Sequence, residues 1–254
     1  MNKKATNHEA LSTLGFENGE DVISWIDSSG EIRSRKASGA CTPMDLHLAM
    51  PARVGHRYRH QRNYHGLYWC AGTRSHVWYE SMSEYSALMN QDHQSSLVAI
   101  AAQPALIQFA DGTRHYPDYF ALHDSGVRVM YDVRPLSLVD ETTVGQFQKT
   151  AQLCERVGWG YEILHGLEGV QRHNLEWIAG YRHPWVRPSE DISERIHEIL
   201  IQPRSLDDVS ALLNPGEPSK GMPAIFHLLW AREIAYDNTV PLSWGTELRR
   251  YQSG

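Results

Sequence analysis

The chain has 254 residues, 41% of them hydrophobic and 21% charged, which is enough apolar material for one sizeable core and a small second domain. A net charge of −6 does not indicate a protein coated with nucleic acid, although a site built from carboxylates would itself add negative charge. No apolar run approaches the roughly 18 residues of a membrane span, and no signal-peptide core follows Met1. We therefore expect a soluble, cytoplasmic protein without membrane contact.

Residues 1–52 are mixed and polar, and we predict that they form a peripheral N-terminal segment with one strand at 22–26. The composition then changes to a basic and aromatic stretch over residues 53–69. Its arginines could neutralise the phosphates of double-stranded DNA, whereas the alternative is an exposed basic loop. The arginines that we expect to contact DNA are Arg53, Arg57, Arg59 and Arg62.

Apolar periodicity predicts the elements of a first domain, residues 53–185. A helix over 79–91 is followed by strands that we interpret as consecutive and antiparallel, at 97–100, 105–109, 116–122 and 127–133. An amphipathic helix over 139–157 then leads to a strand at 161–164. This order of strand, helix and strand predicts a crossover and a partly parallel sheet, which a helix over 167–181 would close.

Two prolines within residues 182–188 predict a linker, so we place the domain boundary at 185/186. Three helices follow, at 192–201, 205–213 and from Pro223 to Ile234, and a turn at Asp237 predicts a hairpin with residues 240–242. Three short helices and a hairpin are typical of a winged helix. The last helix has one basic residue, Arg232, so we expect it to contact protein rather than read DNA.

Three carboxylates, distant in sequence, are candidates for a metal site. Strand alternation places Asp132 on one face of the strand at 127–133, and a hairpin would bring Asp118 beside it. Glu84 shares a helix face with Glu80, and a nearby cation would relieve their repulsion. Hard divalent ions such as Mg²⁺ bind one or two carboxylates together with water and phosphate oxygens. A neighbouring cation, Arg134, would stabilise charge that develops on a phosphate.

Four short motifs carry a family resemblance, in an order that spans residues 53–185. They are Ser81-Met82-Ser83-Glu84, Gln103-Pro104, Tyr116-Pro117-Asp118-Tyr119-Phe120 and Tyr131-Asp132-Val133-Arg134-Pro135. Together they resemble TnsA, the endonuclease subunit of heteromeric transposases. The resemblance implies an α/β, restriction-endonuclease-like fold of the PD-(D/E)xK superfamily, with a mixed central sheet flanked by helices and a small C-terminal winged-helix-like domain over 186–254. By position, it implies that Glu84, Asp118 and Asp132 bind Mg²⁺, for which Mn²⁺ would substitute, and that Arg134 takes the place of the catalytic lysine.

The same resemblance implies a biological role. The chain would cleave the 5' ends at transposon ends in double-stranded DNA, while a DDE transposase subunit cuts and joins the other strand and an AAA ATPase regulates both. It would act in a prokaryotic cytoplasm, associated with the nucleoid when active. Glu80, Gln103 and His115 lie near the motifs as accessory residues rather than direct matches.

Two departures from the family pattern leave alternatives open. Arg134 cannot act as a base, because a guanidinium stays protonated at any relevant pH, and Asp132 is one methylene shorter than the usual glutamate. One alternative is therefore a nuclease-fold module that binds DNA and a partner without useful activity. Another is a stand-alone defence or repair nuclease of the same fold.

Overall fold

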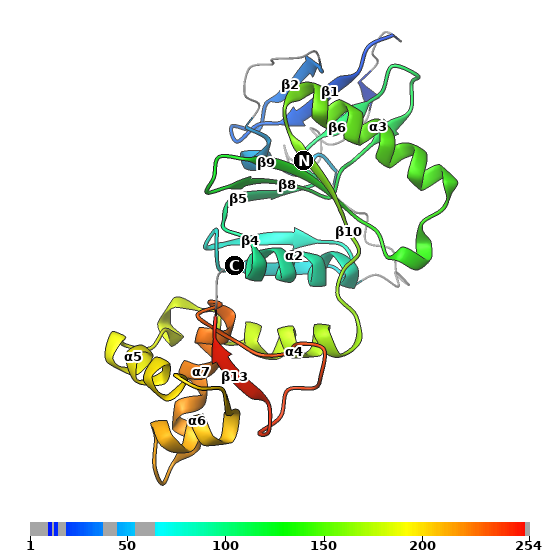
Figure 1. The fold of residues 1–254 in the computed structure, drawn as a ribbon. Coiled ribbons are helices and arrows are strands. Elements are labelled where there is room, and N and C mark those ends of the chain that lie inside the picture. The colour runs from blue at the N-terminus through cyan, green and yellow to red at the C-terminus, as the bar shows by residue number, and fades with distance from the viewer. Residues whose placement is uncertain (1–9, 12, 15–18, 38–44, 54–63, 252–254) are drawn as a thin grey trace. The chain divides into compact units, whose positions relative to one another are not determined.

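The computed structural model describes residues 10, 11, 13, 14, 19–37, 45–53 and 64–251. The chain is a mixed α/β protein, as predicted, and it divides into two compact units, residues 1–166 and 167–254 (Figure 1). Short 3₁₀ turns connect several elements: η1 (Leu46–Leu48), η2 (Leu136–Leu138), η3 (Pro184–Val186) and η4 (Pro218–Gly221).

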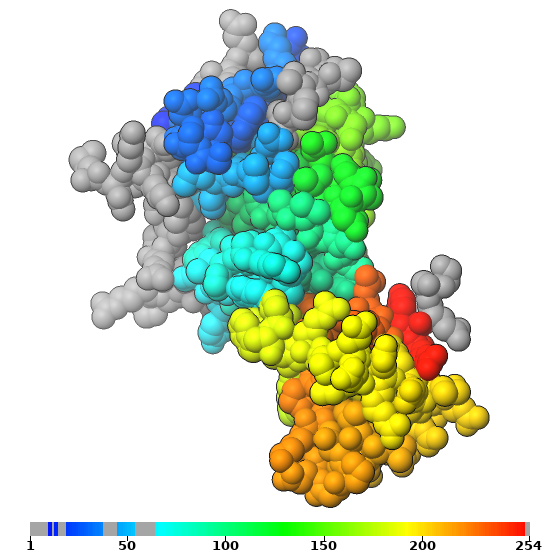
Figure 2. All heavy atoms as spheres, turned by 90° about the vertical axis from the view of Figure 1, so that its left-hand side faces the viewer, coloured from blue at the N-terminus to red at the C-terminus, as the bar shows by residue number. Residues whose placement is uncertain are grey.

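One four-stranded sheet of the first unit has the order β2 (Ile32–Lys36), β1 (Val22–Ile26), β6 (Leu106–Gln108), β7 (Arg114–His115). All its pairs are antiparallel. The predicted strand at 22–26 is confirmed, but the prediction of a peripheral segment is wrong for this part of the chain. All five residues of β1 are buried, because the strand is apolar and has a hydrogen-bonded neighbour on each side. Its partner β2 lies at the edge, and their hairpin forms the blue surface in Figure 2.

The second four-stranded sheet has the order β10 (Gly160–Leu164), β9 (Arg128–Val133), β8 (Tyr119–His123), β5 (Leu97–Ala102). The predicted crossover is confirmed, since α3 (Glu141–Val157) links β9 to the parallel strand β10. The expectation of consecutive antiparallel strands is wrong, because β6 belongs to the first sheet. Gln103, between β5 and β6, has a φ of 47°, and Pro104 has no N–H to continue the ladder, so the chain leaves the second sheet there.

A hairpin of β3 (Gly66–Cys70) and β4 (Ser75–Tyr79) precedes α2 (Met82–Gln94). The helix begins later than the predicted residue 79, because Ser81 is its N-cap and its Oγ accepts a hydrogen bond from Glu84 N at 3.1 Å. At the other end of the helix, the buried Asp92 holds the β3–β4 turn. Its carboxylate accepts hydrogen bonds from four groups: Tyr68 OH, Cys70 Sγ, Ala71 N and Gly72 N.

The main core of the first unit joins both sheets to α3. Its buried members come from β1 and β6, from β8 and β9, and from the helix: Ile23, Trp25, Ile107, Phe120, Met130, Leu153 and Cys154, among others. Packing on both sides of the second sheet explains why its central strands are almost continuously apolar. The polar residues at the ends of β8 and β9 are the exceptions, and they lead to the site.

The second unit contains α4 (Gly169–Ala179), α5 (Glu190–Ile199), α6 (Leu206–Leu213) and α7 (Met222–Trp230). A three-stranded sheet accompanies them, in the order β11 (Arg204–Ser205), β13 (Glu247–Arg250), β12 (Ile234–Ala235). Six of the nine residues of α7 are buried, and the protein contact expected of this helix stays a prediction. The helix forms the centre of this unit.

The unit boundary falls after Gly166 rather than at 185/186. The reason is α4, whose Leu175 and Ile178 are buried and which packs on α7. The predicted strand at 240–242 is also absent, and β12 pairs with β13 instead. Asn174 holds this segment as a loop. Its Nδ2 donates hydrogen bonds to Asn238 O and Val240 O, and its Oδ1 accepts one from Leu242 N. No helix in the described residues has the length and apolar character to cross a bilayer.

Candidate functional site

A cavity of about 660 Å³ lies in the first unit, at the ends of β8 and β9. We call it the carboxylate cavity. It contains every position predicted to be catalytic, namely Glu84, Asp118, Asp132 and Arg134, together with Arg53 and His115. Its other lining residues are Ser81, Ser83, Arg114, Tyr116, Val133, Pro135, Leu138, Thr143, Gln146 and Phe147.

Asp118 and Asp132 lie on neighbouring strands, as the hairpin prediction required. Tyr119 pairs with Tyr131 in the β8–β9 register, and the ladder extends by one bond from Asp118 N to Tyr131 O at 3.1 Å. Asp118 Oδ2 also accepts a hydrogen bond from Val133 N at 2.7 Å. The backbone of one strand therefore fixes the carboxylate of the other, and the two acids line one cavity.

Asp132 is buried, with 3% of its surface exposed, and its Oδ2 has two partners. Tyr161 OH donates a hydrogen bond to this oxygen at 2.6 Å, and His115 Nε2 lies 2.9 Å from it. The other ring nitrogen of His115, Nδ1, is hydrogen-bonded to the side-chain amide of Gln146 on α3. Burial and the adjacent Asp132 charge raise the pKa of Tyr161, so this phenol stays protonated and remains a donor.

The surroundings of Glu84 differ from those of the two aspartates, because its carboxylate accepts hydrogen bonds from residues at the start of its own helix. Ser81 Oγ donates to Oε1 at 2.9 Å, and Glu80 N donates to Oε2 at 2.8 Å. With the bond from Glu84 N to Ser81 Oγ, this is a reciprocal cap of the kind that Ser-x-x-Glu sequences form. Burial raises the pKa of Glu84, and the charge of Glu80 raises it further, although the two hydrogen bonds oppose both effects.

The pKa of Asp118 is the one most affected by the other two acids. Burial raises its pKa well above the usual range, and the charges of Glu84 and then Asp132 raise it further. Asp118 Oδ1 and Asp132 Oδ1 have no hydrogen-bond partner within the described part of the chain. Each strand carboxylate therefore presents one oxygen without a protein donor, in a place where a positive charge would be stabilising.

These donors fit a hard divalent cation. Mg²⁺ binds through one or two carboxylates and completes its shell with water and phosphate oxygens. Among the described residues, no group of three or more His, Cys, Asp or Glu side chains is placed as a metal site, and the metal-binding role of Glu84 stays a prediction. Both oxygens of Glu84 already accept hydrogen bonds at the start of α2. Asp118 and Asp132 are the pair that could hold the ion.

The remaining predicted residues either line the cavity, lie off its lining, or fall outside the described part of the chain. Arg134 lines the cavity, and its Nε donates to Leu138 O at 3.0 Å; no ion pair found among the described residues includes it. Glu80 and Gln103 do not line the cavity. Gln103 is buried, neither polar atom of its side chain has a hydrogen-bond partner, and its backbone N donates to Asp118 O at 2.7 Å. Arg57, Arg59 and Arg62 lie outside the described residues, so the DNA contact expected of them stays a prediction.

Sequence reasoning missed several residues of the site, among them Arg114 and Gln146, which line the cavity, and Tyr161, which is hydrogen-bonded to Asp132. Tyr161 lies on β10, opposite Met130 in the parallel register, and Gln146 lies near the start of α3. A crossover that returns beside β9 predicts that some residue of β10 approaches Asp132. Only the twist and register of the sheet decide which residue does so.

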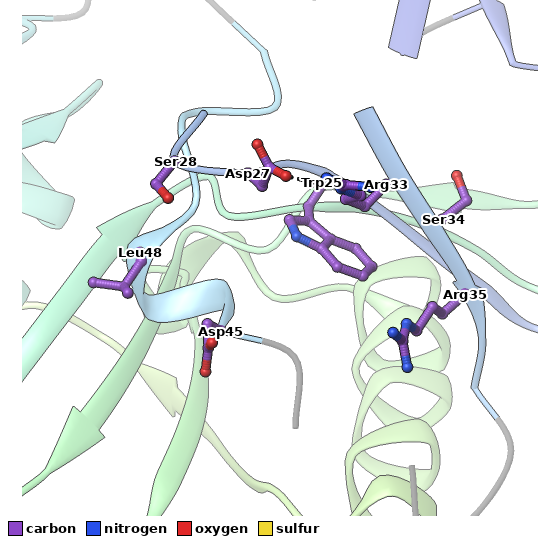
Figure 3. A pocket seen from close by; sticks show the side chains of 8 residues that line it. All are labelled: Trp25, Asp27, Ser28, Arg33, Ser34, Arg35, Asp45 and Leu48. Atoms are coloured by element: carbon purple, nitrogen blue, oxygen red, sulfur yellow. Dashed lines mark hydrogen bonds and ion pairs between the residues drawn. The ribbon is translucent and has the colours of Figure 1, made fainter. Parts of the chain in front are cut away.

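A second cavity of about 470 Å³ lies between the β1–β2 hairpin and η1. Figure 3 shows the Trp25 ring near its centre, with the paired Asp27 and Arg33 on one side and Arg35 on another. Arg33 is committed to Asp27, at 2.8 Å, and to Glu31, at 2.6 Å. Its two lining acids are Asp27, which is paired with Arg33, and Asp45.

The sequence was also compared with known proteins. It matches no model of a protein family and no curated protein.

Proposed function

We propose that this chain is a divalent-metal-dependent DNA endonuclease with a restriction-endonuclease-like first unit and a winged-helix-like second unit. The observation that carries the proposal is the carboxylate cavity, where Asp118 and Asp132 lie on adjacent strands with Glu84 and three arginines around them. Acids from distant segments rarely share one cavity by chance, and perturbed carboxyl groups in a cleft favour a functional site.

The proposed division of roles follows the contacts. Asp118 and Asp132 would hold Mg²⁺ or Mn²⁺, and the bound ion would supply Lewis-acid activation of the phosphate and of the attacking water. Tyr161 and His115 orient Asp132 through contacts with Oδ2, so Oδ1 is the oxygen proposed to bind the ion. Glu84 fixes the start of α2 and contributes negative charge beside Asp118. Arginine side chains of the cavity balance the charge of the phosphate.

By its resemblance to TnsA, we further propose that the chain is the subunit of a heteromeric transposase that cleaves 5' ends at transposon ends. Its partners would be double-stranded DNA, a DDE transposase subunit and an AAA ATPase regulator. An acidic chain without a strong sequence-reading motif is poorly equipped to select a cleavage site alone. The partners would supply that selection.

The test is nicking of supercoiled plasmid DNA in Mg²⁺ or Mn²⁺, by the full chain alone and together with the two partner subunits. We expect cleavage that chelation of the metal abolishes and that falls at least about 10²-fold in Asp118→Asn and in Asp132→Asn, because each removes one charged ligand. Glu162→Gln is the matched control, since Glu162 is exposed on β10 and lies off the cavity lining. Equal cleavage by all four proteins would reject the nuclease site.

A second candidate is a binding module with the same fold and no useful activity. The commitment of both Glu84 oxygens to the helix cap favours it, as does an arginine at position 134, where a base is needed. This module would bind plasmid DNA in a mobility-shift assay but leave it uncut with either metal and with both partners present. Metal-dependent cleavage that Asp118→Asn abolishes would exclude it.

A further inference from the structure

The cations of the carboxylate cavity are Arg53, Arg114 and Arg134, and two of them have clearly different surroundings. Arg134 donates from Nε to Leu138 O, and its charge lowers the pKa of Asp140, the N-cap of α3. It is therefore engaged with the segment that leads into α3. Arg53 instead contacts Glu80 and Tyr116, which lie close in sequence to Glu84 and Asp118.

Arg53 contacts two residues from different segments, Glu80 and Tyr116. Its Nη2 lies 3.2 Å from Glu80 Oε2, just before the cap of α2, and its guanidinium carbon lies 5.4 Å from the centroid of the Tyr116 ring. Tyr116 stands two residues before Asp118. The two anchors of Arg53 thus flank the segments that carry Glu84 and Asp118, and a stacked, ion-paired arginine loses little further freedom on binding a ligand.

The pair of Arg53 and Glu80 also has unused hydrogen-bonding capacity. Glu80 is the one acceptor that the structure gives Arg53 among the residues described, and 46% of the arginine side chain is exposed. A guanidinium has five N–H donors in a planar fork that matches two oxygens of a phosphate. The negative charges of Glu84 and Asp118 would oppose an approaching anion, and the positive charge of Arg53 would offset them.

We propose that Arg53, rather than Arg134, is the arginine that binds the phosphate beside Asp118, and that Glu80 and Tyr116 are its positioning residues. This inference rests on the proposed function, and it assigns the electrostatic role of the family's lysine to a different element of the chain. The ligand is a phosphodiester of the DNA backbone. The contact carries no sequence information, so it would act on all DNA sequences alike.

The experiment compares Arg53→Ala, Arg53→Lys, Arg134→Ala and Arg35→Ala in the full chain, by plasmid cleavage at saturating DNA and by binding of a DNA duplex at several salt concentrations. We expect Arg53→Ala to lower the cleavage rate about 10²-fold and to reduce the slope of log affinity against log salt by about 0.9. Arg53→Lys should restore the salt slope but not the rate, because ammonium lacks the planar fork. Arg35→Ala removes the same charge at the hairpin cavity and should change neither quantity.

A positioning role for Tyr116 gives a second, independent variant. Tyr116→Leu keeps the Arg53 charge but removes the ring beneath it, so the cleavage rate should fall while the salt slope stays at its wild-type value. The inference is wrong if Arg53→Ala matches wild type in both assays, or if Arg134→Ala has the larger effect on cleavage. If wild type binds DNA without cutting it, the proposed nuclease fails, whereas a salt slope lowered in Arg53→Ala alone still supports the phosphate contact.

Discussion

At the scale of single residues, Asp118 is the carboxylate whose charged form the cavity disfavours most. It is partly buried, accepts one backbone hydrogen bond through Oδ2, and lies near two other acids. Removing a carboxylate from water disfavours its charged form, and like charges nearby disfavour it further. A residue selected for stability alone would not be an aspartate here, which is why this position is the strongest single indication of a bound cation.

Asp118→Asn should stabilise the metal-free protein at neutral pH. Because the pKa of Asp118 is raised in the folded state, its contribution to stability is full below the ordinary aspartate pKa, about 3.9, and is lost as the pH rises through the folded pKa. Asparagine keeps the oxygen that accepts from Val133 N but has no such loss. We therefore expect the free energy of unfolding of Asp118→Asn to increase relative to that of wild type as the pH rises above about 4. Urea titrations at several pH values, with chelator present, measure this difference.

Added metal should reverse this order. Wild type should gain about 2.7 kcal/mol of unfolding free energy when the free Mg²⁺ or Mn²⁺ concentration is 100 times its Kd, because the ion binds the folded state alone. The Asp118→Asn variant should gain little. A wild type whose melting temperature does not change with metal, beside a variant that behaves identically, would contradict a cation site at Asp118.

At the scale of elements, Asp92 joins α2 to the β3–β4 hairpin. The carboxylate is 7% exposed and serves two side chains and two backbone N–H groups of the turn. Gly72 belongs to the same contact, since a Cβ there would lie 3.3 Å from Asp92 Oδ1. Asp92 therefore ties the C-terminal part of α2 to the hairpin.

Asp92→Ala should lower the free energy of unfolding by about 3 kcal/mol, because it leaves several buried donors without an acceptor. Tyr68→Phe should lower it by about 1 kcal/mol, the usual value for one hydrogen bond. Asp124→Ala, an exposed acid in the β8–β9 turn, is the control and should change it by less than about 0.5 kcal/mol. Urea denaturation measures all three, and an Asp92→Ala effect no larger than that of the control would reject the anchor.

At the scale of the whole molecule, each unit has its own buried core. In the second unit, α4 contributes buried residues, and the Tyr181 ring that follows it lies 4.9 Å from the Phe226 ring, centroid to centroid. Tyr181 O is also hydrogen-bonded to His227 Nδ1 at 2.8 Å. A boundary at 185/186 would separate these partners, so α4 is part of the second unit and not a cover for the first.

Two fragments test this boundary. We expect residues 167–254 to unfold cooperatively on heating, and residues 186–254 to lack a cooperative transition because α7 loses the helix that packs on it. Circular dichroism at the helical band measures both. Cooperative unfolding of the shorter fragment at the same temperature would show that α4 adds nothing to the second unit.

Local patterns in the sequence were enough to predict the α/β class, the crossover from β9 to β10, and the adjacency of Asp118 and Asp132. These follow from local periodicity and from pairing rules that act between neighbours in the chain. Ser81-x-x-Glu84 is also a capping-box pattern, and the structure forms that cap at the start of α2.

The other features of the fold and of the site could not be predicted from local patterns, because they depend on which distant surfaces pack together. Only packing placed β1 inside a sheet with β6, assigned α4 to the second unit, and brought Tyr161 to Asp132. It also brought Arg53 against Glu80, 27 residues away. Side chains meet across such distances only after registers and helix positions are fixed, and the free energies that fix them are spread over the whole core.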